Sequence, residues 1–211
     1  MIEIQKITDI KQHISGLKAI VFDLDDTLYS EKEYVKSGYA VVAQLLPNVE
    51  NAEDKLWKAF EEKKAAIDDV LRSENIYSEE LKKKCLEAYR FHRPNIHLYA
   101  GASEMLTRLR KKGFLIGIIT DGRPEGQRAK IKALGLDELV DSIIVTDELG
   151  GAEYRKPNKV AFVKMCEMLG VKYEEMCYIG DNINKDFVAP EMIGMKCIFL
   201  KNKDGIYSAD R

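Results

Sequence analysis

The chain has 211 residues, of which 45% are apolar and 32% are charged, and its formal net charge is −2. This composition is typical of a globular protein with room for one α/β domain and a smaller second domain. The balanced charge gives no electrostatic reason for binding to nucleic acid or to an anionic membrane, so we expect neither as a partner. No apolar run approaches membrane-spanning length, and the first sixteen residues carry no apolar leader, so we expect a cytoplasmic protein.

Short apolar runs rich in β-branched residues predict the buried strands of a parallel sheet. In chain order they are Ala19–Phe22, Phe114–Ile119, Ser142–Val145, Met176–Ile179 and Lys196–Leu200. Helical spacing of apolar residues predicts helices between the later strands, at Ser103–Lys112, Glu125–Leu134, Asn158–Leu169 and Asn184–Ile193. This alternation indicates an α/β fold, a doubly wound, mainly parallel Rossmann-like sheet.

The stretch from residue 29 to residue 93 interrupts the alternation, because it contains helical spacing and no convincing buried strand. We therefore expect residues 1–28 and 94–211 to form the Rossmann-like core and residues 29–93 to form an inserted all-helical domain. Tyr29, Lys32, Tyr34 and Arg93 are candidate substrate contacts near the ends of this insertion, although an ordinary surface or packing role is the favoured interpretation of each.

An acidic cluster, Asp23-Leu24-Asp25-Asp26-Thr27, follows the first predicted strand. Alternate residues of a strand point the same way, so Asp23 and Asp25 are expected to share one face. Two such carboxylates can divide the work of phosphoryl transfer, one as the nucleophile and the other as the general acid and base. Taken alone, the cluster is equally consistent with an acidic turn or a helix N-cap.

Two further clusters follow later strands. Thr120-Asp121-Gly122 can offer a hydroxyl and backbone N–H groups to a phosphate ahead of a helix, although Asp-Gly is also common in ordinary turns. Lys156, before Pro157, can bring an ammonium group to neutralise phosphate charge, although lysine is also a frequent surface residue.

The last cluster is Gly180-Asp181-Asn182-Ile183-Asn184-Lys185-Asp186, directly after the fourth predicted strand. Asp181 and Asp186 can join Asp23 around Mg²⁺, which prefers oxygen ligands. The alternative is a capping Asp181 and a solvated Asp186. Ligands of parallel sheets bind at the carboxyl ends of the strands, so clusters at four strand ends together indicate one site.

These four clusters resemble motifs I to IV of the haloacid dehalogenase-like (HAD) superfamily, in the same order and across essentially the whole chain. DLDDTL, TDG, KP and GDNINKD carry the resemblance. The helical insertion directly after the first motif looks like a C1-type cap. The motif spelling is most similar to subfamily I phosphatases, such as pyrimidine nucleotidase-like and N-acylneuraminate phosphatase-like members.

The resemblance implies a role for each motif residue. Asp23 would form an aspartyl-phosphate and bind Mg²⁺, and Asp25 would act as general acid and base and offer its backbone carbonyl to the metal. Thr120, Asp121, Gly122 and Lys156 would hold the phosphoryl group of the substrate. Asp181 would complete the metal site, and Asp186 would orient the metal ligands or Lys156.

The expected activity is therefore hydrolysis of a small phosphorylated metabolite, such as a sugar phosphate, a nucleotide or an acylneuraminate phosphate, by a monomer or small homo-oligomer. The dehalogenase branch lacks an aspartate at the position of Asp25, which argues against that activity. A phosphomutase on the same core is the nearest alternative. A receiver domain fits poorly, because it would be shorter and uncapped. A non-catalytic binding protein is disfavoured by the intact motif residues.

Overall fold

The structure is a computed structural model that describes residues 1–206. Within that range the strands form one six-stranded parallel sheet in the order β1-β6-β5-β2-β3-β4. The strands are β1 (Ile2–Ile4), β2 (Ala19–Phe22), β3 (Leu115–Thr120), β4 (Ser142–Val145), β5 (Met176–Gly180) and β6 (Lys196–Leu200). The predicted α/β, doubly wound parallel sheet is confirmed.

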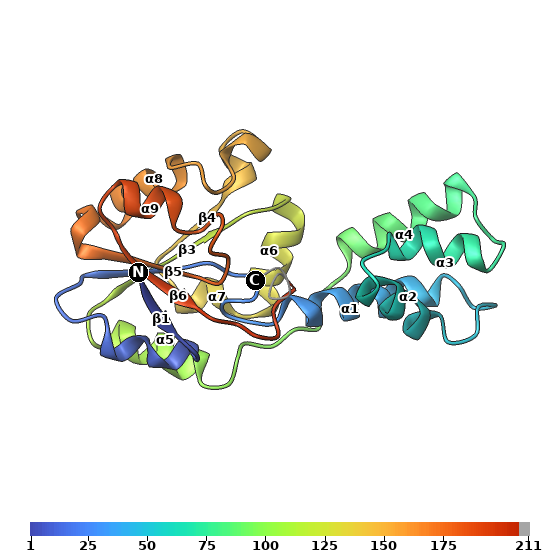
Figure 1. Ribbon diagram of the computed structural model, residues 1–211, viewed down its shortest axis with the longest axis horizontal. Helices are drawn as coiled ribbons and strands as arrows, with labels where there is room; N and C mark the ends of the chain where they lie inside the picture. Colours follow the sequence, from blue (N-terminus) through green and yellow to red (C-terminus); the bar gives the residue numbers. More distant parts are fainter. Residues whose placement is uncertain (207–211) are drawn as a thin grey trace. The chain divides into compact units, whose positions relative to one another are not determined.

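Helices cover both faces of this sheet (Figure 1). In the core they are α5 (Ala102–Lys111), α6 (Pro124–Ala133), α7 (Leu136–Leu139), α8 (Val160–Leu169) and α9 (Val188–Met192). Short 3₁₀ turns lie at η1 (Ile7–Gln12), η2 (Thr146–Leu149), η3 (Ala152–Tyr154) and η4 (Tyr173–Glu175). Figure 1 shows α8 and α9 on one face of the sheet and α5 on the other.

The apolar runs are buried because both faces of each central strand are covered. Every residue of β2 is fully buried, and Phe162 and Met165 of α8 pack into the cluster that includes Val21 and Tyr178 of the sheet. This packing fixes the direction and register of the strands whose ends carry the polar motifs.

Most predicted elements agree with the structure to within a residue or two at each end, but one strand was missed and two helices begin later than predicted. No strand was predicted before Ala19, yet β1 pairs with β6 at the edge of the sheet, where a three-residue strand is too short for a sequence pattern. The helix predicted from Asn158 begins at Val160, whose N–H donates to the Asn158 side chain. The helix predicted from Asn184 begins only at Val188, because the preceding residues form a loop in which Asn182 donates its N–H to Asp186.

The chain divides into two compact units, one made of Met1–Glu31 with His97 onward and the other of Lys32–Ile96. The sequence suggested boundaries at 29 and 93, and residues 207–211 of its core segment lie outside the described residues. The second unit is helical, with α1 (Glu31–Gln44), α2 (Ala52–Glu61), α3 (Ala66–Ser73) and α4 (Glu79–Phe91). Its buried apolar residues include Val42, Leu56, Val70, Leu71 and Cys85.

The sequence contains no apolar run long enough to suggest a membrane-spanning helix. No helix described between residues 1 and 206 is long and apolar enough to cross a membrane.

Candidate active site

The polar motifs meet because their strands are neighbours. Asp23 follows β2 and Asp181 follows β5, and these strands pair in parallel with Phe22 opposite Ile179. Thr120 is the last residue of β3, which pairs with the other edge of β2. The chain runs outward from β2 to β4 on one side and returns to β5 on the other, so this position is a topological switch point, where ligands of such sheets bind.

Three carboxylates form a buried cluster at these strand ends. One oxygen from each of Asp23, Asp181 and Asp186 lies within 4.8 Å of the others, and all three side chains are buried. Burial and the charges of Asp23 and Asp186 raise the pKa of Asp181 to about 8. Burial also raises the pKa of Asp23 to about 6, although Lys156 opposes that shift. Such a concentration of negative charge and oxygen donors fits a hard divalent cation such as Mg²⁺.

Lys156 lies between two of these carboxylates. Its Nζ is 2.7 Å from Asp23 Oδ1 and 2.8 Å from Asp186 Oδ1, and its side chain is fully buried. It also donates to the hydroxyl of Tyr178 at 2.8 Å. Burial lowers the pKa of Lys156, but Asp186 and Asp23 raise it well above its ordinary value. The ammonium therefore stays charged and offsets part of the carboxylate charge.

Asp25 lies beside this cluster but has different partners. Its Oδ1 accepts from Lys130 Nζ at 2.7 Å and from the Tyr29 hydroxyl, and its Oδ2 accepts from Gln127 Nε2 at 2.8 Å. Burial raises the pKa of Asp25, but the charge of Lys130 and these hydrogen bonds outweigh burial and lower it overall. Asp25 is thus ionised and held on both oxygens.

The three residues of the second motif, Thr120, Asp121 and Gly122, have different surroundings. Thr120 is fully buried, and its Oγ1 accepts from Gln127 Nε2. Asp121 accepts from the Lys156 backbone N–H at 3.0 Å and from the Thr146 hydroxyl at 2.9 Å. Gly122 has a φ of 135°, which favours glycine. Direct contact of Thr120, Asp121 and Gly122 with a phosphate stays a prediction.

A cavity of about 320 Å³ opens beside these residues. Residues from all four motifs line this cavity, but the predicted site residues Thr120, Gly122 and Asp186 do not. The lining residues are Asp23, Asp25, Asp26, Glu31, Asp121, Arg155, Lys156, Asp181, Asn182 and Lys185. A larger hollow of about 700 Å³ between η1 and α5 contains none of the predicted site residues.

Sequence analysis did not select several residues around the cavity. Glu31, Arg155 and Lys185 line it, and burial raises the pKa of Glu31 to about 8. Gln127 and Lys130 reach Asp25 from α6, more than a hundred residues away in the chain. Lys185 could have been found, since it lies inside the fourth motif, but nothing in the helical pattern of α6 marks Gln127 or Lys130.

Two of the candidate substrate contacts, Tyr29 and Tyr34, are buried side chains. Tyr29 belongs to the core unit and is fully buried, with its hydroxyl bonded to Asp25. Tyr34 is buried against the rings of Tyr89 and His92 within the helical unit. Both tyrosines are buried within their own units, which agrees with the packing role that the sequence favoured, and a contact with substrate stays a prediction. Their aromatic and polar character did not distinguish the two roles.

The family model of the haloacid dehalogenase-like hydrolases matches residues 17–194 of this chain. That range spans all four motifs and the helical unit. The chain belongs to this family. The HAD resemblance inferred from the motifs is therefore confirmed, and the protein is a HAD-like hydrolase.

Several relatives are named phosphatases, and one, from Burkholderia cepacia, is named a (S)-2-haloacid dehalogenase and is 30% identical over 48% of this chain and 41% of its own length. Glyceraldehyde 3-phosphate phosphatase of Methanopyrus kandleri is 27% identical over 88% of this chain and 84% of its own length. The same enzyme of Pyrococcus furiosus is 37% identical, but the match spans 48% of this chain and 41% of the relative. Among solved structures, the HAD-hydrolase YfnB of Bacillus subtilis, bound to magnesium, is 23% identical, with a TM-score of 0.60 over 88% of this chain and 87% of its own.

Proposed function

We propose that this HAD-like hydrolase is a Mg²⁺-dependent phosphatase that hydrolyses a small phosphomonoester through an aspartyl-phosphate on Asp23. One observation carries the proposal. A buried lysine, Lys156, contacts Asp23 and Asp186 within a three-carboxylate cluster, beside a cavity that Asp25 also lines. Phosphoryl transfer needs positioning and charge neutralisation, and this arrangement supplies both.

The first step is attack by an Asp23 carboxylate oxygen on phosphorus. The new bond joins Asp23 to phosphorus while the ester P–O bond breaks. Asp25, which is ionised in the free protein, must take up a proton when the phosphorylated substrate binds, and it then gives that proton to the departing oxygen. In the second step Asp25 takes a proton from water, the water oxygen attacks phosphorus and the bond to Asp23 breaks. Asp23 is thereby regenerated and inorganic phosphate leaves. Lys156 offsets negative charge beside Asp23 throughout.

Asp23 and Asp181, with the backbone carbonyl of Asp25, would hold Mg²⁺, and Asp186 would orient Lys156. The bound ion would neutralise the oxygens of the transferring phosphoryl group. The buried set of oxygen donors supports this assignment, and the magnesium bound to the Bacillus subtilis structural neighbour agrees with it.

The proposed substrate class is a small phosphorylated metabolite, and the proposed location is the cytoplasm. The modest cavity supports a small substrate, as do relatives named for a three-carbon phosphate. We propose that the helical unit Lys32–Ile96 is a cap that selects among substrates and excludes water. A phosphomutase would return the phosphoryl group to the substrate, so analysis of products separates it from a phosphatase.

The test is release of inorganic phosphate from p-nitrophenyl phosphate, glyceraldehyde 3-phosphate, sugar phosphates and nucleoside monophosphates. We expect turnover with Mg²⁺ and none in excess EDTA. Asp23→Asn should lose on the order of 10³-fold or more in kcat. Asp137→Asn, an exposed aspartate on α7, is the matched control and should stay near wild type. Wild-type turnover by Asp23→Asn would refute the mechanism, and isomerised sugar phosphate without free phosphate would establish the mutase.

A further inference from the structure

The proposed acid and base, Asp25, is held by side chains outside the four motifs. Lys130 and Gln127 reach it from α6, and Tyr29 reaches it from the turn that follows the first motif. These three residues are 5%, 3% and 0% exposed, so their polar groups are shielded from water. Hydrogen bonds shielded from water are stronger, and a buried polar group that loses its partner carries a desolvation penalty.

Two of these donors belong to one face of α6. Residues three apart on a helix are neighbours on its surface, so Gln127 and Lys130 approach Asp25 side by side. The Gln127 amide nitrogen carries two hydrogens and has two acceptors, Asp25 Oδ2 and Thr120 Oγ1. It therefore ties the end of β2 to the end of β3.

Lys130 supplies the charged contact. Its Nζ lies 2.7 Å from Asp25 Oδ1, with side-chain exposures of 6% and 19% for the two residues. A charge-assisted hydrogen bond is stronger and more directional than a neutral one. With Oδ1 held by Lys130 and Tyr29 and Oδ2 held by Gln127, the plane and position of the carboxylate are both defined. Asp25 still lines the cavity with Asp23.

We infer that Lys130 is a positioning residue, which together with Gln127 and Tyr29 holds the Asp25 carboxyl group at the leaving oxygen of the substrate. The inference rests on the proposed phosphatase function. Residues outside the four motifs, on one face of α6, would then set the geometry of proton transfer without touching the substrate.

Positioning of an acid has a specific kinetic signature. A p-nitrophenolate ion leaves without a proton, whereas an alkoxide needs one as the ester bond breaks. The ratio kcat/KM reports the steps up to that cleavage. A displaced Asp25 should therefore lower kcat/KM for an alkyl phosphate and spare it for p-nitrophenyl phosphate. Loss of structure alone would lower both together.

The experiment compares wild type with Lys130→Met on glycerol 3-phosphate and p-nitrophenyl phosphate, with Mg²⁺ present. We expect kcat/KM to fall on the order of 10²-fold for the alkyl ester and less than about threefold for the aryl ester. Lys130→Arg keeps the charge and should recover much of the loss. Lys132→Met, an exposed lysine on the same helix, is the matched control and should change neither value.

Tyr29→Phe provides a second variant if Lys130→Met does not fold, because it removes one hydroxyl and keeps the packed ring. It should show a smaller loss confined to the alkyl ester. Equal losses for both esters, no loss, or a gain for the alkyl ester would overturn the inference. A wild-type protein that releases phosphate from neither ester would instead overturn the proposed function, and the inference with it.

Discussion

At the scale of single residues, Lys156 combines complete burial with a positive charge. Its ammonium is fully buried and contacts two carboxylates at 2.7 and 2.8 Å. Removal of one partner from a buried ionic cluster costs more than the cluster itself contributes, since the remaining charges keep their desolvation penalty. The same side chain therefore serves stability and the proposed chemistry.

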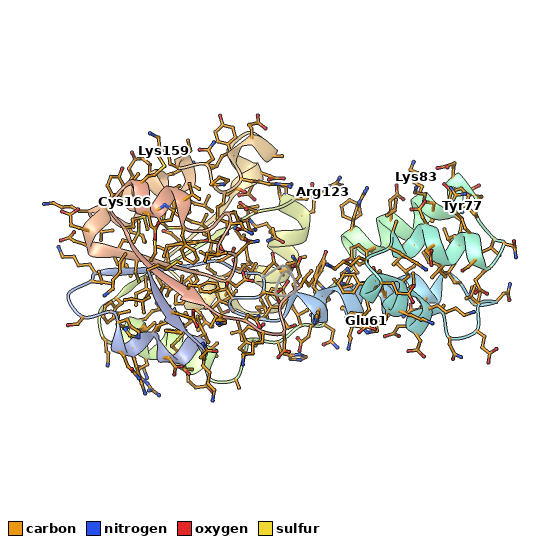
Figure 2. All side chains as sticks on the ribbon, in the orientation of Figure 1. Glu61, Tyr77, Lys83, Arg123, Lys159 and Cys166 are labelled. Atoms are coloured by element: carbon orange, nitrogen blue, oxygen red, sulfur yellow. The ribbon has the colours of Figure 1, made fainter. Side chains whose placement is uncertain are left out.

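Lys156→Met should lower the free energy of unfolding by about 3–5 kcal/mol, as measured by urea denaturation in EDTA. It leaves Asp23 and Asp186 facing each other without the ammonium between them. Lys159→Met is the control, because Lys159 is exposed beside α8 (Figure 2). The control should stay within about 0.5 kcal/mol of wild type. If Lys156→Met changed the free energy of unfolding as little as the control does, the proposed stabilisation by the buried ammonium would be contradicted.

At the scale of elements, the end of β5 depends on a close approach between backbone and side chain. Gly180 is the last residue of β5, and a Cβ at that position would lie 2.4 Å from Asp186 Oδ2 and 2.8 Å from its Cγ. The loop after β5 folds Asp186 back over the strand end, where its Oδ2 accepts from the Asn182 N–H. Only glycine leaves room for that return.

Gly180→Ala should therefore move Asp186 away from Lys156 and from the carboxylate cluster. We expect a loss of about 1–3 kcal/mol in unfolding free energy, typical of an overpacked site, and a weaker affinity for Mg²⁺. Urea denaturation and calorimetric titration with Mg²⁺ measure the two effects. Unchanged metal affinity in a folded Gly180→Ala protein would show that the position of Asp186 is unimportant for the metal.

At the scale of the whole molecule, the buried acids link stability to pH. The pKa of Asp181 is raised to about 8 and that of Glu31 to about 8, above their ordinary values of 3.8 and 4.5. Between those limits the folded protein holds more protons than the unfolded chain. Without metal, these groups make the free energy of unfolding fall as pH rises, by about 1.4 kcal/mol per pH unit for each extra proton held.

A bound divalent cation should reverse that penalty, because it takes the place of the protons. We expect Mg²⁺ to raise the thermal midpoint more at pH 8 than at pH 6, since at pH 6 Asp181 must first lose its proton. Thermal unfolding at matched ionic strength, with Mg²⁺ or with EDTA, measures the difference. An equal effect of Mg²⁺ at both pH values would argue against metal binding by Asp181.

The sequence by itself determined the sheet class and the candidate motif positions. Strands such as β2 and β5 are continuous apolar runs, and buried parallel strands require that pattern wherever they lie in the sheet. Asp23, Lys156 and Asp181 could be selected because they follow those runs or precede a helix. The edge strand β1 escaped prediction, because three residues that gain their stability from pairing with β6 leave no periodic signal.

Only the tertiary structure decided which side chains from distant segments meet. The partners of Asp25 are four residues away in the case of Tyr29, and 102 and 105 residues away in the cases of Gln127 and Lys130. Helical periodicity shows that α6 has a buried face, but not which strand end that face meets. That choice depends on strand order, which places β3 beside β2 and brings α6 over the first motif. Contacts between distant segments depend on how the elements pack in three dimensions, so they cannot be predicted from the local sequence of either segment.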